Sequence, residues 1–267
     1  MSPTITILGC GSSGGVPRVG SGWGACDPAD RRNRRRRCSI LVERGSREAT
    51  TRLLVDTSPD LREQLLDAEV TRLDAVLFTH EHADHTHGID DLRPLVIHMR
   101  RRMPVYMDEA TSRIMRARFD YCFETPPGSD YPPILEEWPI LPGSPVVVAG
   151  AGGAIRALPL PVRHGPIEAL GFRFDDIAYV PDVSTMPEST ERLLHGLDVL
   201  IIDALRYTPH PTHYSVGEAL ALIDRTRPRR AVLTNLHSDL DYAKLAGELP
   251  PHIVPAFDGM RVEASGA

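Results

Sequence analysis

The residues with the clearest chemical potential lie in one short segment, Thr79-His80-Glu81-His82-Ala83-Asp84-His85. It holds three of the chain's 11 histidines and one candidate carboxylate beside them. An apolar, strand-like run, Ala75–Phe78, precedes it, and a loop after a buried strand is a usual place for catalytic groups. Imidazole and carboxylate bind zinc or manganese, and open coordination positions make such a site catalytic. We therefore expect a metal site here rather than a polar loop with scattered histidines.

Other side chains that can bind a metal also follow strand-like runs. His164 follows Leu158–Arg163, Asp182 follows Ile177–Pro181, His237 follows Ala231–Leu236, and Asp56 follows Leu53–Val55. Each alone could be an ordinary polar residue at a strand end. Beside the histidine-rich segment, metal binding is the better interpretation of His164 and Asp182.

As a set, these motifs resemble the HxHxDH signature and accessory motifs of the metallo-β-lactamase superfamily, over residues 56–237. The resemblance implies two divalent ions, Mn²⁺ or Zn²⁺, that hold a water and lower its pKa toward neutrality. It implies that Asp56 supports the metal loop, and we count Asp84 with the catalytic residues. By resemblance, His80, His82 and His164 bind the first metal, Asp84, His85 and His237 bind the second, and Asp182 bridges both.

His237 departs from the usual spacing of the superfamily. There a histidine often directly follows the threonine of this motif, whereas here Asn235 follows Thr234 and His237 comes two residues later. Alternating side chains in extended chain would let His237 reach the metals from the same side. We predict His237 as the ligand, because imidazole binds these metals better than carboxamide does. If it is not a ligand, the second site is weaker.

The two ends of the chain carry a narrower resemblance. Gly9–Pro17, Trp23-Gly24, Cys38-Ser39 and Phe257–Met260 are similar to the phosphodiesterases of the carbon–phosphorus lyase pathway that act on a phosphoribosyl cyclic phosphate. This implies a small phosphodiester substrate, cyclic ribose or nucleotide-like, attacked by metal-activated hydroxide.

The same resemblance implies a role for His213 in contacting phosphate or protonating the leaving alkoxide. His210 is a second candidate for this role. The alternative interpretation of His213 is a surface histidine beside the helix cap Ser215. Members of this branch can carry a structural zinc on a cysteine cluster after Trp-Gly. Ala25-Cys26-Asp27-Pro28 offers no such cluster, so we predict no structural zinc and allow for a different small phosphodiester.

Length and composition fit a globular enzyme. We expect one domain over residues 1–267, because this length can bury a substantial core. The net charge of −6 argues against a large nucleic-acid surface. No apolar run approaches the ~20 residues that span a bilayer, and the start does not read as a secretory signal. Cys10, Cys26, Cys38 and Cys122 form no CxxC pair, so we expect free thiols, a cytoplasmic location and, by default, a homodimer.

Strand-like and helical segments alternate, which indicates a mixed α/β chain; the resemblance implies a four-layer αββα sandwich. We predict helices at 59–66 (capped by Ser58), 88–101, 108–119, 188–195, 215–225 and 241–248, and an irregular segment at 125–145. The arginine run Arg31–Arg37 reads as a surface loop rather than a phosphate site. Asp90 and Arg93 are pocket candidates or part of an exposed helix face.

Several other functions share these features. A ribonuclease Z-like tRNA processor would use the same ligands but usually has a protruding arm, which the sequence does not suggest. A β-lactamase would be expected to carry an export signal. A thioesterase of the glyoxalase II kind, or a metal-binding regulatory protein without turnover, remains an alternative.

Overall fold

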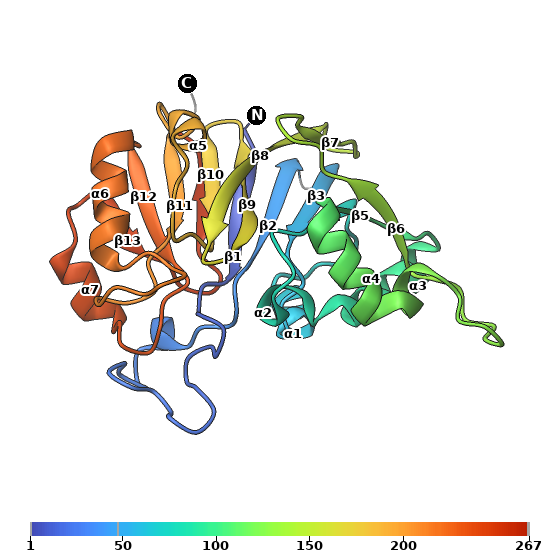
Figure 1. Ribbon diagram of the computed structural model, residues 1–267, viewed down its shortest axis with the longest axis horizontal. Helices are drawn as coiled ribbons and strands as arrows, with labels where there is room; N and C mark the ends of the chain where they lie inside the picture. Colours follow the sequence, from blue (N-terminus) through green and yellow to red (C-terminus); the bar gives the residue numbers. More distant parts are fainter. Residues whose placement is uncertain (1, 47, 266–267) are drawn as a thin grey trace.

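The strands form two seven-stranded sheets packed face to face, in a computed structural model that describes residues 2–46 and 48–265 (Figure 1). In order across the first sheet lie β14 (Arg261–Glu263), β1 (Thr4–Gly9), β2 (Ser39–Gly45), β3 (Thr50–Val55), β4 (Ala75–Leu77), β5 (Met103–Met107) and β6 (Leu135–Pro139). Across the second lie β13 (Ile253–Pro255), β12 (Arg230–Thr234), β11 (Val199–Asp203), β10 (Ile177–Val180), β9 (Ile167–Phe174), β8 (Ile155–His164) and β7 (Val146–Val148).

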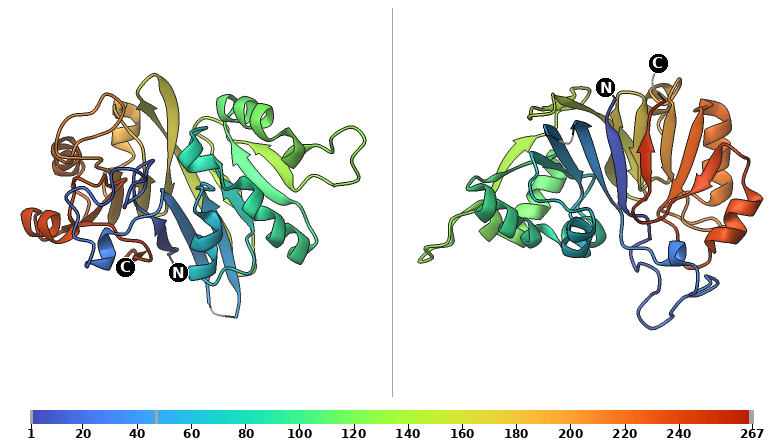
Figure 2. Two further views of the ribbon diagram at one scale, coloured as in Figure 1. Left: turned by 90° about the horizontal axis from the view of Figure 1, so that it is seen from below. Right: turned by 180° about the vertical axis from the view of Figure 1, so that it is seen from behind.

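Helices cover the outer face of each sheet (Figures 1 and 2). The first sheet packs against α1 (Leu61–Asp67), α3 (Arg93–Met99) and α4 (Glu109–Phe123). The second packs against α5 (Glu188–Arg192), α6 (Val216–Thr226) and α7 (Tyr242–Glu248). The predicted αββα sandwich is therefore confirmed. Over residues 2–46 and 48–265, no helix has the length and apolar character to cross a membrane.

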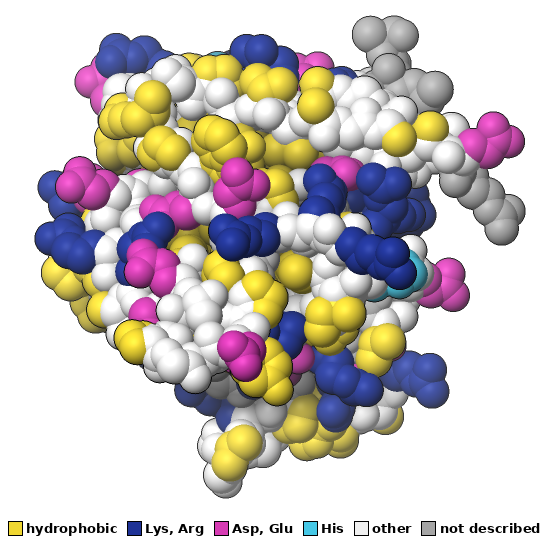
Figure 3. Space-filling model, turned by 90° about the vertical axis from the view of Figure 1, so that its right-hand side faces the viewer, with side chains coloured by type: hydrophobic (Ala, Val, Ile, Leu, Met, Phe, Trp, Pro, Cys, Tyr) yellow, Lys and Arg dark blue, Asp and Glu magenta, His cyan; other side chains and the backbone are white. Residues whose placement is uncertain are grey.

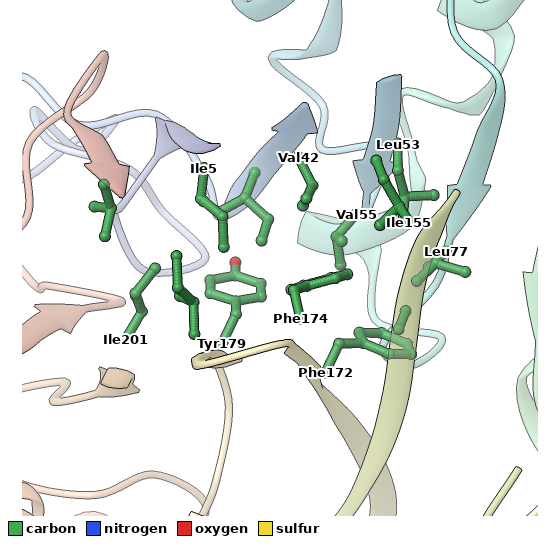
Figure 4. Packing of buried hydrophobic residues seen from close by; sticks show 14 of the residues in the cluster. Ile5, Val42, Leu53, Val55, Leu77, Ile155, Phe172, Phe174, Tyr179 and Ile201 are labelled. Carbon is green, nitrogen blue, oxygen red and sulfur yellow. The ribbon is translucent and has the colours of Figure 1, made fainter. Parts of the chain in front are cut away.

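The core between the sheets is built from alternate strand residues that point inward. Ile5 of β1 faces the ring of Tyr179 on β10, and Val55 of β3 lies above Phe174 of β9 (Figure 4). Each large apolar side chain buried in this way contributes about 1.5–3 kcal/mol. This rigid interior holds the strand ends, and the loops that follow them, in defined positions.

Two predicted helices differ in detail. The first begins at Leu61 with Asp60 at its N-cap, while the hydroxyl of Ser58 donates to Gln64 Oε1 and accepts from the Asp60 N–H. Ser58 therefore closes the turn before the helix, and the predicted capping role is wrong. The predicted helix 88–101 is a 3₁₀ turn, η2 (Ile89–Leu92), followed by α3.

Three strands were not predicted. One is β5, which lies between two predicted helices. β9 follows β8 across a tight turn that pairs His164 with Ile167, and its charged residues and Gly171 obscure the pattern. β6 lies inside the segment expected to be irregular and pairs in parallel with β5. Its terminal proline is tolerated because β6 is an edge strand. On the right-hand side of Figure 1, where β6 lies, hydrophobic, basic and acidic side chains are interspersed on the surface (Figure 3).

The arginine run is only partly a surface loop. Arg35 is 2% exposed and donates to the carbonyl oxygens of Leu240 (2.7 Å) and His237 (3.2 Å). The expectation of a surface loop is therefore wrong for Arg35, which joins the N-terminal loop to the segment after β12. The four cysteines are buried free thiols, as predicted.

Candidate metal centre

The candidate ligands come together at one edge of the sandwich, where several strands end. The histidine-rich segment follows β4 and includes the one-turn helix α2 (Ala83–Thr86), at the lower edge in Figure 1. His164 is the last residue of β8, and Asp182 comes two residues after β10. Because β4 lies in one sheet and β8 and β10 in the other, the site spans both sheets.

Four predicted ligands form a compact group. His80, His82, His164 and Asp182 each offer a ligand atom, and these atoms all lie within 4.8 Å of one another. Asp182 Oδ2 lies 3.3 Å from His80 Nε2 and 3.8 Å from His164 Nε2. It also lies 3.2 Å from His85 Nε2, so His85 borders the same carboxylate oxygen.

Hydrogen bonds to the opposite ring nitrogens aim the imidazoles inward. His164 Nδ1 donates to the carbonyl of Thr212 at 2.6 Å, which leaves the Nε2 lone pair for a ligand bond. His85 Nδ1 lies 2.7 Å from Asp56 Oδ2, and Asp56 also accepts from the backbone N–H and hydroxyl of Thr79. Asp56 thus supports the loop, as the resemblance implied. Such second contacts orient metal-binding histidines.

The chemistry of the group fits a divalent cation. His80 Nε2 is buried and makes no hydrogen bond to any described residue, although Asp182 Oδ2 lies 3.3 Å away. Burial and the nearby charge of His85 lower the pKa of His80 to about 3, and burial also lowers the pKa of His164. Both imidazoles are therefore neutral, which metal binding requires.

Asp84 and His85 lie at the margin of this group. Asp84 Oδ2 is 3.6 Å from His85 Nε2. Although burial opposes charge on His85, the carboxylates of Asp182, Asp56 and Asp84 raise its pKa well above the ordinary value. The carboxylates that favour a proton on His85 would also attract a metal cation to the same place.

A second group lies beside the first. Asp182, Asp203 and His213 also offer atoms within 4.8 Å of one another. His213 Nδ1 is 2.9 Å from Asp203 Oδ2, and the rings of His213 and His164 are 4.6 Å apart. The side-chain amide of Asn235 donates to Asp182 Oδ1 at 2.8 Å. His213 therefore faces the candidate metal group.

Asp203 was missed by the sequence reasoning. It ends β11 and is fully buried, and it accepts the backbone N–H of Val183. A carboxylate after the apolar run Val199–Ile202 was the only signal in the sequence, and the same signal had pointed to Asp182.

The other predicted residues are not members of these groups in the described part of the chain, although the ring of His210 lies 5.3 Å from that of His213. His237 Nδ1 is 2.9 Å from Asp239 Oδ1, and among the described residues neither group includes His237. His210 Nδ1 accepts from Thr212 in its own loop. Asp90 and Arg93 pair with each other on the surface, at 3.0 Å.

Comparisons with known proteins agree with this geometry. Residues 51–235 match the model of the β-lactamase superfamily domain. The crystal structure of a diphosphatase from the PhnP family is 34% identical, with a TM-score of 0.87, and the match covers 98% of this chain and 97% of that one. Human tRNase Z, short form, shares 15% identity with a TM-score of 0.65, over 98% of this chain and 99% of its own, which shows a common fold.

A curated relative is longer than this chain. The octanoyltransferase of Porphyromonas gingivalis is 36% identical over 259 residues, which is 95% of this chain and 50% of that protein. The chain therefore spans about half the length of that relative, whose name describes the whole protein.

Proposed function

This chain belongs to the metallo-β-lactamase superfamily, close to the PhnP family of hydrolases, and from that premise we propose that it hydrolyses a small phosphodiester. The observation that carries the proposal is the convergence of His80, His82, His164 and Asp182 beside the Asp203–His213 pair. Divalent cations held there would lower the pKa of a water and stabilise charge on the phosphoryl oxygens.

We assign the ligands to two cation positions of the same site. His80, His82, His164 and Asp182 would hold the first, and Asp84, His85 and Asp182 would border the second. Neutral imidazoles and carboxylates suit both Zn²⁺ and Mn²⁺. His237 would become a ligand at the second position only if its side chain moved away from Asp239.

His213 would act as the acid that protonates the leaving oxygen. Its Nδ1 is engaged by Asp203, so Nε2 is available to the substrate. Burial lowers its pKa, but the hydrogen bond and charge of Asp203 more than offset this and raise the pKa to about 9. His213 therefore carries a proton at neutral pH, which suits donation to an alkoxide.

The test is a substrate panel with metal-depleted protein reloaded with Mn²⁺ or Zn²⁺. It contains bis-p-nitrophenyl phosphate, a ribose cyclic phosphate, a nucleoside diphosphate ester, an octanoyl thioester and a β-lactam. We expect metal-dependent turnover of the cyclic phosphate or another phosphodiester. Turnover of the diphosphate linkage alone would replace phosphodiester by phosphoanhydride as the substrate class. Inactivity on every compound, with metal bound, would contradict an enzymatic role for this site.

The octanoyltransferase relative favours a second candidate, an octanoyl ester or thioester as the substrate. The same site could direct water at an acyl carbonyl instead of phosphorus. Faster hydrolysis of the octanoyl thioester than of every phosphate compound would select this candidate over the first.

A further inference from the structure

Asn235 stands where the second cation position needs another ligand. It directly follows β12, is buried, and has a left-handed backbone with φ of 60°. Asparagine, aspartate and histidine are the side chains that tolerate this conformation best. The backbone conformation therefore favours a short polar side chain at this position.

The nitrogen end of the Asn235 amide faces the site. It lies 2.8 Å from Asp182 Oδ1, 3.2 Å from Asp203 Oδ1 and 3.2 Å from the carbonyl oxygen of Pro181. A fourth neighbour, His213 Nδ1, lies 3.1 Å away and is itself engaged by Asp203. The three oxygens are acceptors only, so they select the NH₂ group, which donates hydrogen bonds and is no metal ligand.

This contact engages one of the two carboxylate oxygens of Asp182, which would otherwise be free to bind a cation. Asp182 Oδ1 accepts from Asn235, and only Oδ2 faces His80, His85 and His164. A second cation would have Asp84, His85 and a share of Oδ2.

His237 does not supply the missing ligand. Its backbone N–H donates to the carbonyl of Leu205, and its own carbonyl accepts from Arg35. Its imidazole Nδ1 lies 2.9 Å from Asp239 Oδ1 without forming a hydrogen bond, and among the described residues neither ligand group includes it.

We propose that the Asn235 amide replaces a ligand of the second position, so that this chain binds one cation tightly and the second only weakly. The inference rests on the metal site of the proposed function. Loss of a hydrogen-bonding partner behind a ligand already lowers metal affinity by about 10- to 100-fold, so loss of a ligand should lower it by at least that much.

The experiment is equilibrium dialysis of metal-depleted protein against rising Zn²⁺ or Mn²⁺, with bound metal measured by mass spectrometry. We expect the wild type to take up one equivalent, and the second only at free metal at least about 10- to 100-fold higher. Asn235→His should bring the second step down toward the first, whereas Asn235→Ala should not.

His237→Ala provides an independent check, because that side chain is partly exposed and outside both groups. It should leave both uptake steps unchanged. Uptake of two equivalents in one step by the wild type, or loss of the second equivalent in His237→Ala, would overturn the inference while leaving the metal site intact. No uptake of either cation would overturn both the inference and the proposed function.

Discussion

Asp203 Oδ2 lies 2.9 Å from Nδ1 of His213, beside the candidate metal group but outside its histidine-rich loop. The two residues come from the end of β11 and the turn before α6. The arrangement separates two tasks. The histidine-rich loop, His164 and Asp182 can hold cations, while the Asp203–His213 pair can hold a proton for the leaving group.

His213→Gln should lower kcat by about 100-fold, because general acid catalysis typically contributes 10²–10⁴-fold. The loss should be largest for a poor alkoxide leaving group and small for p-nitrophenolate, which needs no protonation. Asp203→Asn should show the same dependence to a lesser degree. Equal losses on both substrates, or loss of bound metal in His213→Gln, would mean that His213 does not act as the acid.

His80→Ala should lose the tightly bound cation and with it at least 100-fold in kcat/KM, because the group would lose a buried imidazole ligand. Asp84→Ala should also lower activity. Glu81→Ala is the matched control, since Glu81 lies in the same loop outside both groups. Metal content and turnover are measured on the same samples, and a fully active His80→Ala protein would contradict the assignment.

The stability of the metal-depleted protein should fall as the pH rises from about 6.5 to 9. The pKa of His213 is raised from 6.5 to about 9 in the folded chain. The stabilisation is therefore complete below the unfolded pKa and lost as the pH passes the folded one. The stabilisation that His213 contributes in this way is at most about 3 kcal/mol. Urea unfolding in chelator at both pH values should show this fall in the wild type and a smaller fall in His213→Gln, where His85 still contributes through its raised pKa. Equal falls would refute the role of His213.

Arg35→Met should lower the free energy of unfolding by about 3 kcal/mol, because it strips two backbone carbonyls, at His237 and Leu240, of a buried charged donor. Arg34→Met is the control, since Arg34 is exposed and should change stability by less than about 0.5 kcal/mol. Denaturant unfolding measures both. Equal stability of the two variants would show that Arg35 does not hold the loops together.

Local features were predictable from the sequence. The histidine-rich loop stood out because its residues are adjacent and follow an apolar strand, and α6 because Ser215 offers an N-cap. The structure adds the reciprocal contact of Glu218, which completes a capping box. Both depend on contacts between residues close in the chain.

Features that depend on distant contacts were not predictable. Arg35 is buried by acceptors more than 200 residues away, and nothing in the arginine run distinguishes it from its neighbours. Asp203 meets its hydrogen-bond partner, His213, only when the turn before α6 folds back over β11. Likewise, the pairing of Asn235 with Asp182 joins two separate strand ends.

The most direct test is anomalous diffraction from crystals of the protein loaded with Zn²⁺. We predict a strong peak about 2.0–2.2 Å from the ligand atoms of His80, His82, His164 and Asp182. A second, weaker peak should lie near Asp84 and His85. A well-ordered site with no anomalous peak among the first four side chains, or with zinc bound only elsewhere, would contradict the account.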